Sequence, residues 1–167
     1  MSDSDPDEQA ALARLRGASE VLVREVVRAL PGWARARAAI LGEAWGGWAP
    51  ARLEAVCREA GKAGERAAAR VGEELTALFS LDPADQRATP LEVVRGAVAE
   101  PTAVLADAGL PAVVRDSLAE RWWPGDPYDL SPRTFADIDG DLAAVHFAWG
   151  LAKARVHKAR RPAAAPD

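Results

Sequence analysis

The sequence predicts an all-α protein, an irregular multi-helix bundle with one long central helix. Apolar residues recur at three- and four-residue steps through most of the chain. Proline and small polar residues stand where helices are expected to begin. No segment shows the alternating apolar and polar pattern of a half-buried β-strand bounded by turns.

The first half of the chain predicts three helices. Asp5 is the expected N-cap of the first helix, and Pro6 follows at the first helical position. Proline and glycine at positions 31–32 are expected to break or kink this helix, because proline lacks the N–H that the helical ladder requires. A second helix is expected over residues 33–45. The stretch 33–48 contains three tryptophans, for which core packing is the favoured expectation.

The longest helix is expected over residues 51–79, after Pro50. Its apolar positions form a seam whose middle consists of small residues, so another helix can approach closely there. A neighbouring helix of the same chain is the expected partner, and a homodimer through this seam is the alternative. Cys57 lies on the seam, where we expect a buried, unreactive thiol.

The second half begins with a clear helix start. Thr89 and Glu92 have the spacing of a capping box, with proline between them at the first helical position. This helix is expected to end near residue 99, because the Glu-Pro pair at 100–101 disfavours its continuation. A short helix should then run to Gly109, a residue suited to a C-terminal cap.

Two further helices are expected, from Pro111 to Trp122 and over residues 141–160. Asp139 or Asp141 is the expected cap of the last helix. Asp137, Asp139 and Asp141 also have the first three spacings of a calcium loop, but the glycine and glutamate that such a loop requires are missing. No metal site is therefore expected.

The loop before the last helix is the first candidate interaction site. It combines aromatic and charged residues with three prolines, a composition that suits a rigid binding loop. The alternative is that its aromatic residues close the end of the bundle while its carboxylates cap helices. The candidate residues are Trp122, Trp123, Asp126, Tyr128, Asp129 and Arg133.

The last helix supplies the second candidate site. His146, Trp149 and Lys153 could line a small-molecule pocket against the 122–133 loop. For His146 the competing expectation is a packed, hydrogen-bonded histidine that does no chemistry. No cofactor is expected, since the sequence has no phosphate-binding loop, no nucleophile with an adjacent base and no metal-ligand spacing.

Composition and charge limit the remaining function classes. The 167 residues, 49% of them hydrophobic, suit one helical domain over 1–161, with a disordered tail at 162–167. The net charge of -4 is unevenly distributed: residues 82–141 hold 12 acidic and 5 basic residues, whereas residues 142–161 hold five basic and no acidic ones. A solvated, self-complementary surface is the favoured expectation for this pattern, and docking of the basic last helix beside the acidic middle of the chain is the alternative.

Nucleic acid is an unlikely partner by charge, because the sequence pI near 5.3 opposes a main role in binding it. The residues that would serve that alternative are Arg155, Lys158, Arg160 and Arg161. No membrane partner is expected either, because the longest uncharged stretch, 142–152, cannot cross a bilayer. The acidic N-terminus predicts no secretory signal, and the single cysteine suits a reducing cytoplasm.

Residues 82–158 carry motifs that resemble a family of uncharacterised helical proteins of about this size from high-GC bacteria. The resemblance implies no activity, but it implies that the proline-rich loop is characteristic of the family. The motifs are Asp82-Pro-Ala-Asp-Gln-Arg-Ala-Thr-Pro-Leu-Glu, Pro101-Thr-Ala-Val-Leu, Gly109-Leu-Pro-Ala-Val-Val-Arg-Asp, Trp123-Pro-Gly-Asp-Pro-Tyr-Asp-Leu-Ser-Pro and Trp149-Gly-Leu-Ala-Lys-Ala.

These observations favour a non-enzymatic, cytoplasmic helical protein that acts through protein–protein contacts at the 122–133 loop. In that hypothesis Trp and Tyr side chains are apolar anchors, and Asp126 and Asp129 pair with basic groups of an unknown partner. The alternatives are a small-molecule-binding or regulatory domain and a nucleic-acid-binding accessory protein.

Overall fold

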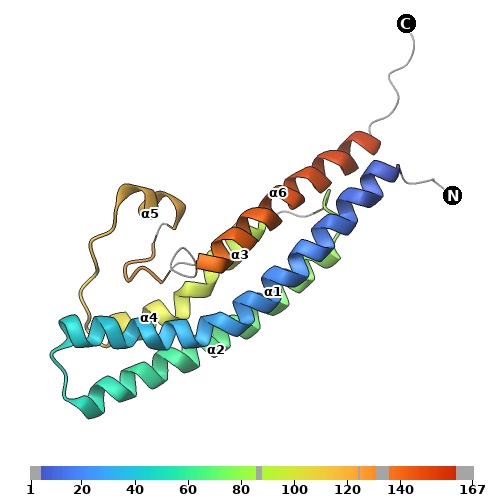
Figure 1. Ribbon diagram of the computed structural model, residues 1–167. Helices are drawn as coiled ribbons and strands as arrows, with labels where there is room; N and C mark the ends of the chain where they lie inside the picture. Colours follow the sequence, from blue (N-terminus) through green and yellow to red (C-terminus); the bar gives the residue numbers. More distant parts are fainter. Residues whose placement is uncertain (1–4, 86–87, 124, 131–135, 161–167) are drawn as a thin grey trace, which may run out of the picture.

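Two long antiparallel helices form the frame of the molecule (Figure 1). The structure is a computed structural model that describes residues 5–85, 88–123, 125–130 and 136–160, with the backbone alone at 122 and 136–142. Helix α1 spans Pro6–Leu41 and helix α2 spans Pro50–Ser80; a π-helical turn, Gly42–Gly46, follows α1 directly. The described residues contain no β-strand, so the prediction of an all-α, multi-helix fold is confirmed.

Helix α1 continues through Pro31, so the expected break and the separate helix over 33–45 are wrong. The other expectation, a kink, agrees with the change of direction that α1 makes along its length in Figure 1. Its N-terminus is as expected, because Asp7 N–H donates to the side chain of Asp5 at 3.1 Å. Leu30 and Ala34, on either side of the proline, are buried against α2. Tertiary packing thus outweighs the hydrogen bond lost at Pro31, and α1 rather than α2 is the longest helix.

Helix α2 has the predicted bounds to within one residue and buries its small-residue seam. The seam packs against α1 of the same chain, whose Leu22, Val26 and Leu30 belong to the same buried cluster as Val71 and Leu75 of α2. The intramolecular partner that the sequence favoured therefore occupies the seam. A homodimer cannot use these residues while the bundle is folded.

The next helices confirm one predicted boundary and move another. Thr89 caps helix α3, Pro90–Arg95: Thr89 N–H donates to the Glu92 carboxylate at 2.8 Å, and Glu92 N–H donates to the Thr89 hydroxyl at 3.1 Å. A 3₁₀ turn at Gly96–Val98 separates α3 from helix α4, Ala99–Asp107. The predicted break at 100–101 is wrong, because proline 101 falls in the first turn of α4, where its missing N–H costs no bond. As predicted, Gly109 follows the helix with a positive φ of 83°.

The predicted helix from Pro111 to Trp122 is only half present. Helix α5 spans Ser117–Trp122, and residues 110–116 are not helical. Val113 N–H donates to the carbonyl of Pro127 at 2.9 Å, so this backbone pairs with the loop that follows α5 instead of with itself. Asp116 then caps α5 by accepting from Ala119 N–H at 2.7 Å.

Helix α6, Ala136–Ala159, packs along α1 toward the N-terminus, as Figure 1 shows. It begins five residues before the predicted start at 141, so Asp139 and Asp141 lie within it and do not cap it. Its basic end contacts acidic residues: Arg155 pairs with Asp7 at 3.2 Å, and Arg160 donates to Asp82. The expected tail at 162–167 lies outside the described residues.

Candidate interaction surface

The aromatic residues of the 122–130 segment face the interior of the bundle. Trp123 is 4% exposed and belongs to the buried cluster of α1 and α2. Tyr128 is buried in a second cluster near the turn after α1, and its hydroxyl donates to the carbonyl of Leu110 at 2.9 Å. Burial raises the pKa of Tyr128. These two side chains close the bundle, and neither is accessible as an anchor for a partner.

The two aspartates of this segment are held by arginines of the same chain. Asp126, only 1% exposed, accepts from Leu130 N–H at 2.8 Å. The Arg115 guanidinium lies 4.0 Å from a carboxylate oxygen of Asp126 and 4.0 Å from one of Asp129. Arg37 donates to the carbonyl of Tyr128 at 2.9 Å. Asp126 is therefore not open to basic groups of a partner, whereas the Asp129 side chain is 30% exposed and stays partly accessible.

Two residues of the first candidate set are not fully described by the structure, and one residue that contacts the set was not predicted from the sequence. Arg133 and the side chain of Trp122 lie outside the described residues. Sequence reasoning did not single out Arg115, although a segment with two carboxylates close to buried aromatics requires a nearby cation. Nothing in the local pattern shows that this cation comes from residue 115.

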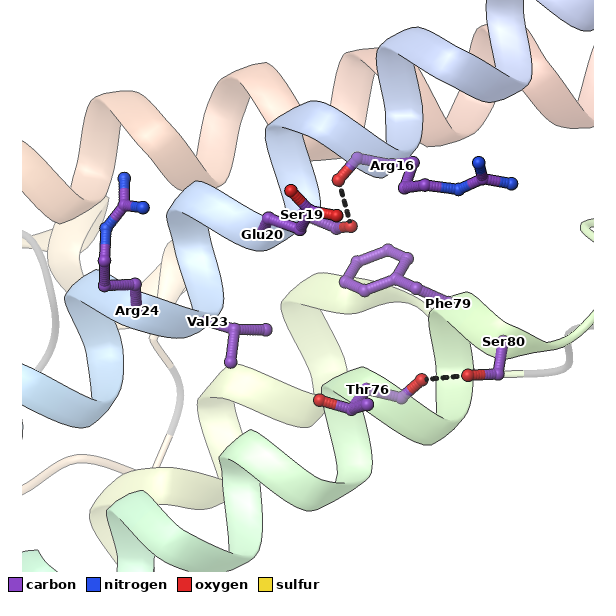
Figure 2. Close-up of a pocket in the computed structure, with 8 residues that line it drawn as sticks. All are labelled: Arg16, Ser19, Glu20, Val23, Arg24, Thr76, Phe79 and Ser80. Carbon is purple, nitrogen blue, oxygen red and sulfur yellow. Dashed lines mark hydrogen bonds between the residues drawn. The ribbon is translucent and has the colours of Figure 1, made fainter.

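The second candidate set is brought together on α6. The rings of His146 and Trp149 stack with their centroids 6.0 Å apart, and Lys153 Nζ lies 4.9 Å from the Trp149 ring centroid. His146 is exposed, so the expectation of a packed core histidine is wrong. The cleft drawn in Figure 2 lies between α1 and α2, and none of these three residues lines it.

An exposed apolar stripe lies next to the stacked side chains of His146, Trp149 and Lys153. It consists of Phe147, which is 70% exposed, and the small exposed residues Ala143, Gly150 and Ala154. With 3.6 residues per turn, the stripe lies opposite the buried side of α6, which consists of Val145, Ala148, Ala152 and Val156. We call the exposed side the α6 outer face; it consists of Ala143, His146, Phe147, Gly150, Lys153, Ala154, His157 and Lys158.

The α6 outer face has basic groups on both edges and no carboxylate. Residues 143–160 contain no Asp or Glu at all. Of the four Lys and Arg side chains in residues 143–160, those of Arg155 and Arg160 pair with acidic residues of the bundle. Lys158 and His157 are exposed near its C-terminal end. The surface thus combines an apolar centre with positive edges.

The described residues give information on two kinds of reactive group, a metal site and the Cys57 thiol. In the part of the chain that the structure covers, no three His, Cys, Asp or Glu side chains gather closely enough to hold a metal ion. Burial, and secondly the charge of Glu54, raise the pKa of the Cys57 thiol, which lowers its thiolate fraction and its reactivity. The exposed arrangement on α6 is suited to binding.

Comparison with known proteins gives no match: no family model fits the chain, and no curated protein or solved structure is similar to it. The resemblance of residues 82–158 to a bacterial family stays a prediction. Among the described residues, every helix is too short or too polar to span a lipid bilayer.

Proposed function

We propose that this protein is a helical interaction module that binds an acidic, amphipathic helix of another protein through the α6 outer face. The observation that carries the proposal is the exposure of Phe147 in the centre of an apolar stripe with basic edges. Large exposed aromatic side chains of this kind are common anchors in protein interfaces.

The spacing of the stripe favours a helical partner. Ala143, Phe147, Gly150 and Ala154 follow one another at steps of four, three and four residues, which is the seam of two helices packed side by side. Three of the four have small side chains, so a partner backbone can approach closely. The stripe spans 12 residues, whose 11 steps of 1.5 Å give a length of about 16 Å, or three turns of a partner helix.

The charge of the surface favours an acidic partner and disfavours a second copy. Two α6 outer faces would bring Lys153 and Lys158 of one chain near the same cations of the other, and no carboxylate of residues 143–160 would offset them. A partner helix with Asp or Glu beside its apolar seam would pair with these edges. Burial of Phe147 would contribute about 1.5–3 kcal/mol.

Photo-cross-linking from the surface tests the proposal directly. Replacing Phe147 by p-benzoylphenylalanine in the cells of the source organism should trap a partner segment that mass spectrometry can sequence. We expect a segment with apolar residues at helical spacing and flanking Asp or Glu. The same cross-linker at Val114, an exposed apolar residue outside α6, is the matched control and should not trap that segment.

Affinity measurements with the trapped segment as a synthetic peptide complete the test. Phe147→Ser should weaken binding by about 10- to 100-fold. Lys158→Glu, as a separate variant, should also weaken binding, and its effect should be larger at low salt. Val114→Ser should leave the affinity unchanged. A trapped segment without acidic residues, unchanged affinity of the Phe147→Ser variant, or no cross-link at all would contradict the proposal.

We also propose a cytoplasmic location. The single cysteine is buried and is not paired in a disulfide, as is usual in reducing compartments. Fractionation of the source cells followed by immunoblotting would test this, and recovery in a secreted fraction would contradict it.

A further inference from the structure

A second surface lies on the α1–α2 pair, away from the α6 outer face. Two adjoining clefts of about 510 and 520 Å³ run between the two helices and share Val23, Thr76 and Ser80. Figure 2 shows Phe79 beneath α1 and Val23 directed toward the gap between the helices. We call the two clefts together the α1–α2 groove; its lining residues come from 16–27 of α1 and 69–80 of α2.

The α1–α2 groove is apolar at its centre. Val27 is 42% exposed and adjoins Val23, Gly72 and Ala77 in the lining. The hydroxyl groups in the groove are already bonded to helix carbonyls at 2.7 Å, and Figure 2 draws two of these bonds. They belong to Ser19, Thr76 and Ser80. An apolar helix face therefore fits the groove better than a polar small molecule does.

Near the centre of the groove the two rims carry opposite charges, Arg24 on α1 and Glu73 on α2, whereas Arg16 and Glu20 both line the α1 side farther toward its N-terminus. A Cβ atom on Gly72 would lie 3.0 Å from a methyl group of Val27, so these two residues are level on the antiparallel helices. Arg24 lies three residues before Val27 on α1, and Glu73 lies one residue after Gly72 on α2. On antiparallel helices the two residues therefore differ in level by two residues, about 3 Å. Arg24 is 67% exposed, and the carboxylate nearest to its guanidinium is that of the adjacent Glu25, at 3.9 Å.

We infer that the α1–α2 groove is the interface of a homodimer. Under a two-fold axis parallel to the helices, α1 of one copy faces α2 of the other copy, and every residue keeps its height along the axis. Arg24 of each copy then faces Glu73 of the second copy, so the charge pair forms twice, and the Val27 side chains fill the centre. A closed, self-complementary interface of this kind is the commonest form of homo-oligomer. The α6 outer face stays accessible in this dimer.

A foreign helix would fit this charge pattern less well. Opposite charges on the two rims of one groove are self-complementary under the two-fold axis, whereas an unrelated helix would need opposite charges on its own two sides in matching register. The inference is independent of the partner proposed for α6, because it rests on other residues and is tested without any partner.

Sedimentation equilibrium of the full chain over a wide concentration range tests the dimer. We expect a species of twice 17.7 kDa at high concentration. Arg24→Glu and Glu73→Arg should each raise the dimer dissociation constant on the order of tenfold or more, and the double variant should recover most of the loss, because the swapped charges attract again. Arg14→Glu makes the same charge change on an exposed part of α1 outside the groove and should have no effect.

Circular dichroism melting confirms that each variant is folded before its mass is measured. Arg24→Gln, which adds no negative charge next to Glu25, is the second variant if Arg24→Glu melts early, and it should also weaken the dimer. A monomer at every concentration would overturn the inference. So would a dimer that is insensitive to both single substitutions, or one that the double variant fails to restore.

Discussion

Gly64 of α2 lies directly against the backbone of Pro31 in α1. A Cβ atom on Gly64 would be 2.9 Å from the Cα of Pro31 and 3.1 Å from the carbonyl oxygen of Leu30. The two long helices therefore approach each other closely at the position where α1 lacks a hydrogen bond. Packing at this point lets α1 continue past a proline that would otherwise favour its end, and Figure 1 shows that the helix changes direction along its length.

Gly64→Ala should destabilise the bundle. The added methyl group meets backbone atoms, which cannot rotate away, so α1 and α2 must move apart and lose contacts along the seam. We expect the free energy of unfolding to fall by about 1–3 kcal/mol, measured by urea denaturation.

Gly61→Ala is the matched control on the same helix. Its new Cβ would lie 3.6 Å from the Cβ of Arg35, an ordinary contact. Since alanine is the better helix former, this variant should gain about 0.5–1 kcal/mol of stability. Equal losses in both variants would mean that the approach at Pro31 is not the cause.

The sequence predicts the helix boundaries that local chemistry decides and misses those that distant contacts decide. Pro50 and the Thr89–Glu92 capping box act within one helical turn, and both helix starts were predicted correctly. Pro31 was misjudged because Gly64, 33 residues away, determines its effect. The start of α5 was misjudged because the N–H of Val113 bonds with the carbonyl of Pro127.

Tyr128→Phe should destabilise the protein although the ring remains. The Tyr128 hydroxyl donates to the buried carbonyl of Leu110, and its removal leaves that carbonyl without this donor. We expect a loss of about 1–2 kcal/mol in the free energy of unfolding. Trp45→Phe changes an exposed aromatic and should leave stability nearly unchanged. A neutral Tyr128→Phe would show that the loop is not fixed by this bond.

The candidate site shows a different limit of sequence analysis. Helix α6 is apolar on two opposite sides, one containing Val145 and Ala152 and the other containing Phe147 and Ala154. Both sides have helical spacing, so the pattern alone cannot show which side packs on α1. His146, Trp149 and Lys153 are neighbours on α6, and their role as pocket residues stays a prediction. Phe147 was not predicted as a site residue.

Cys57 should react slowly with thiol reagents in the folded protein. It is buried, and burial raises the pKa of its thiol, so both access and the thiolate fraction are reduced at a given pH. We expect reaction with Ellman's reagent to be at least about tenfold slower than for a free thiol and to reach the free rate in denaturing urea. Fast labelling of the native protein at neutral pH would contradict this burial.

The pairing of Arg160 with Asp82 should make the attachment of α6 sensitive to acid. The hydrogen bond from Arg160, with a second from Ala84 N–H, lowers the pKa of Asp82. A carboxyl group whose pKa is lower in the folded state adds stability above its unfolded pKa, near 3.9, and loses that contribution as the pH falls through the folded value. Since both side chains are partly exposed, we expect a small effect, about 2 °C in Tm. Asp82→Asn should lower Tm by that amount at pH 7, and the difference should shrink as the pH falls below the ordinary range of an aspartate. Asp85→Asn, which leaves the pair intact, should match the parent protein throughout. An equal shift for Asp82→Asn at neutral and at acid pH would show that the ion pair does not hold the end of α6.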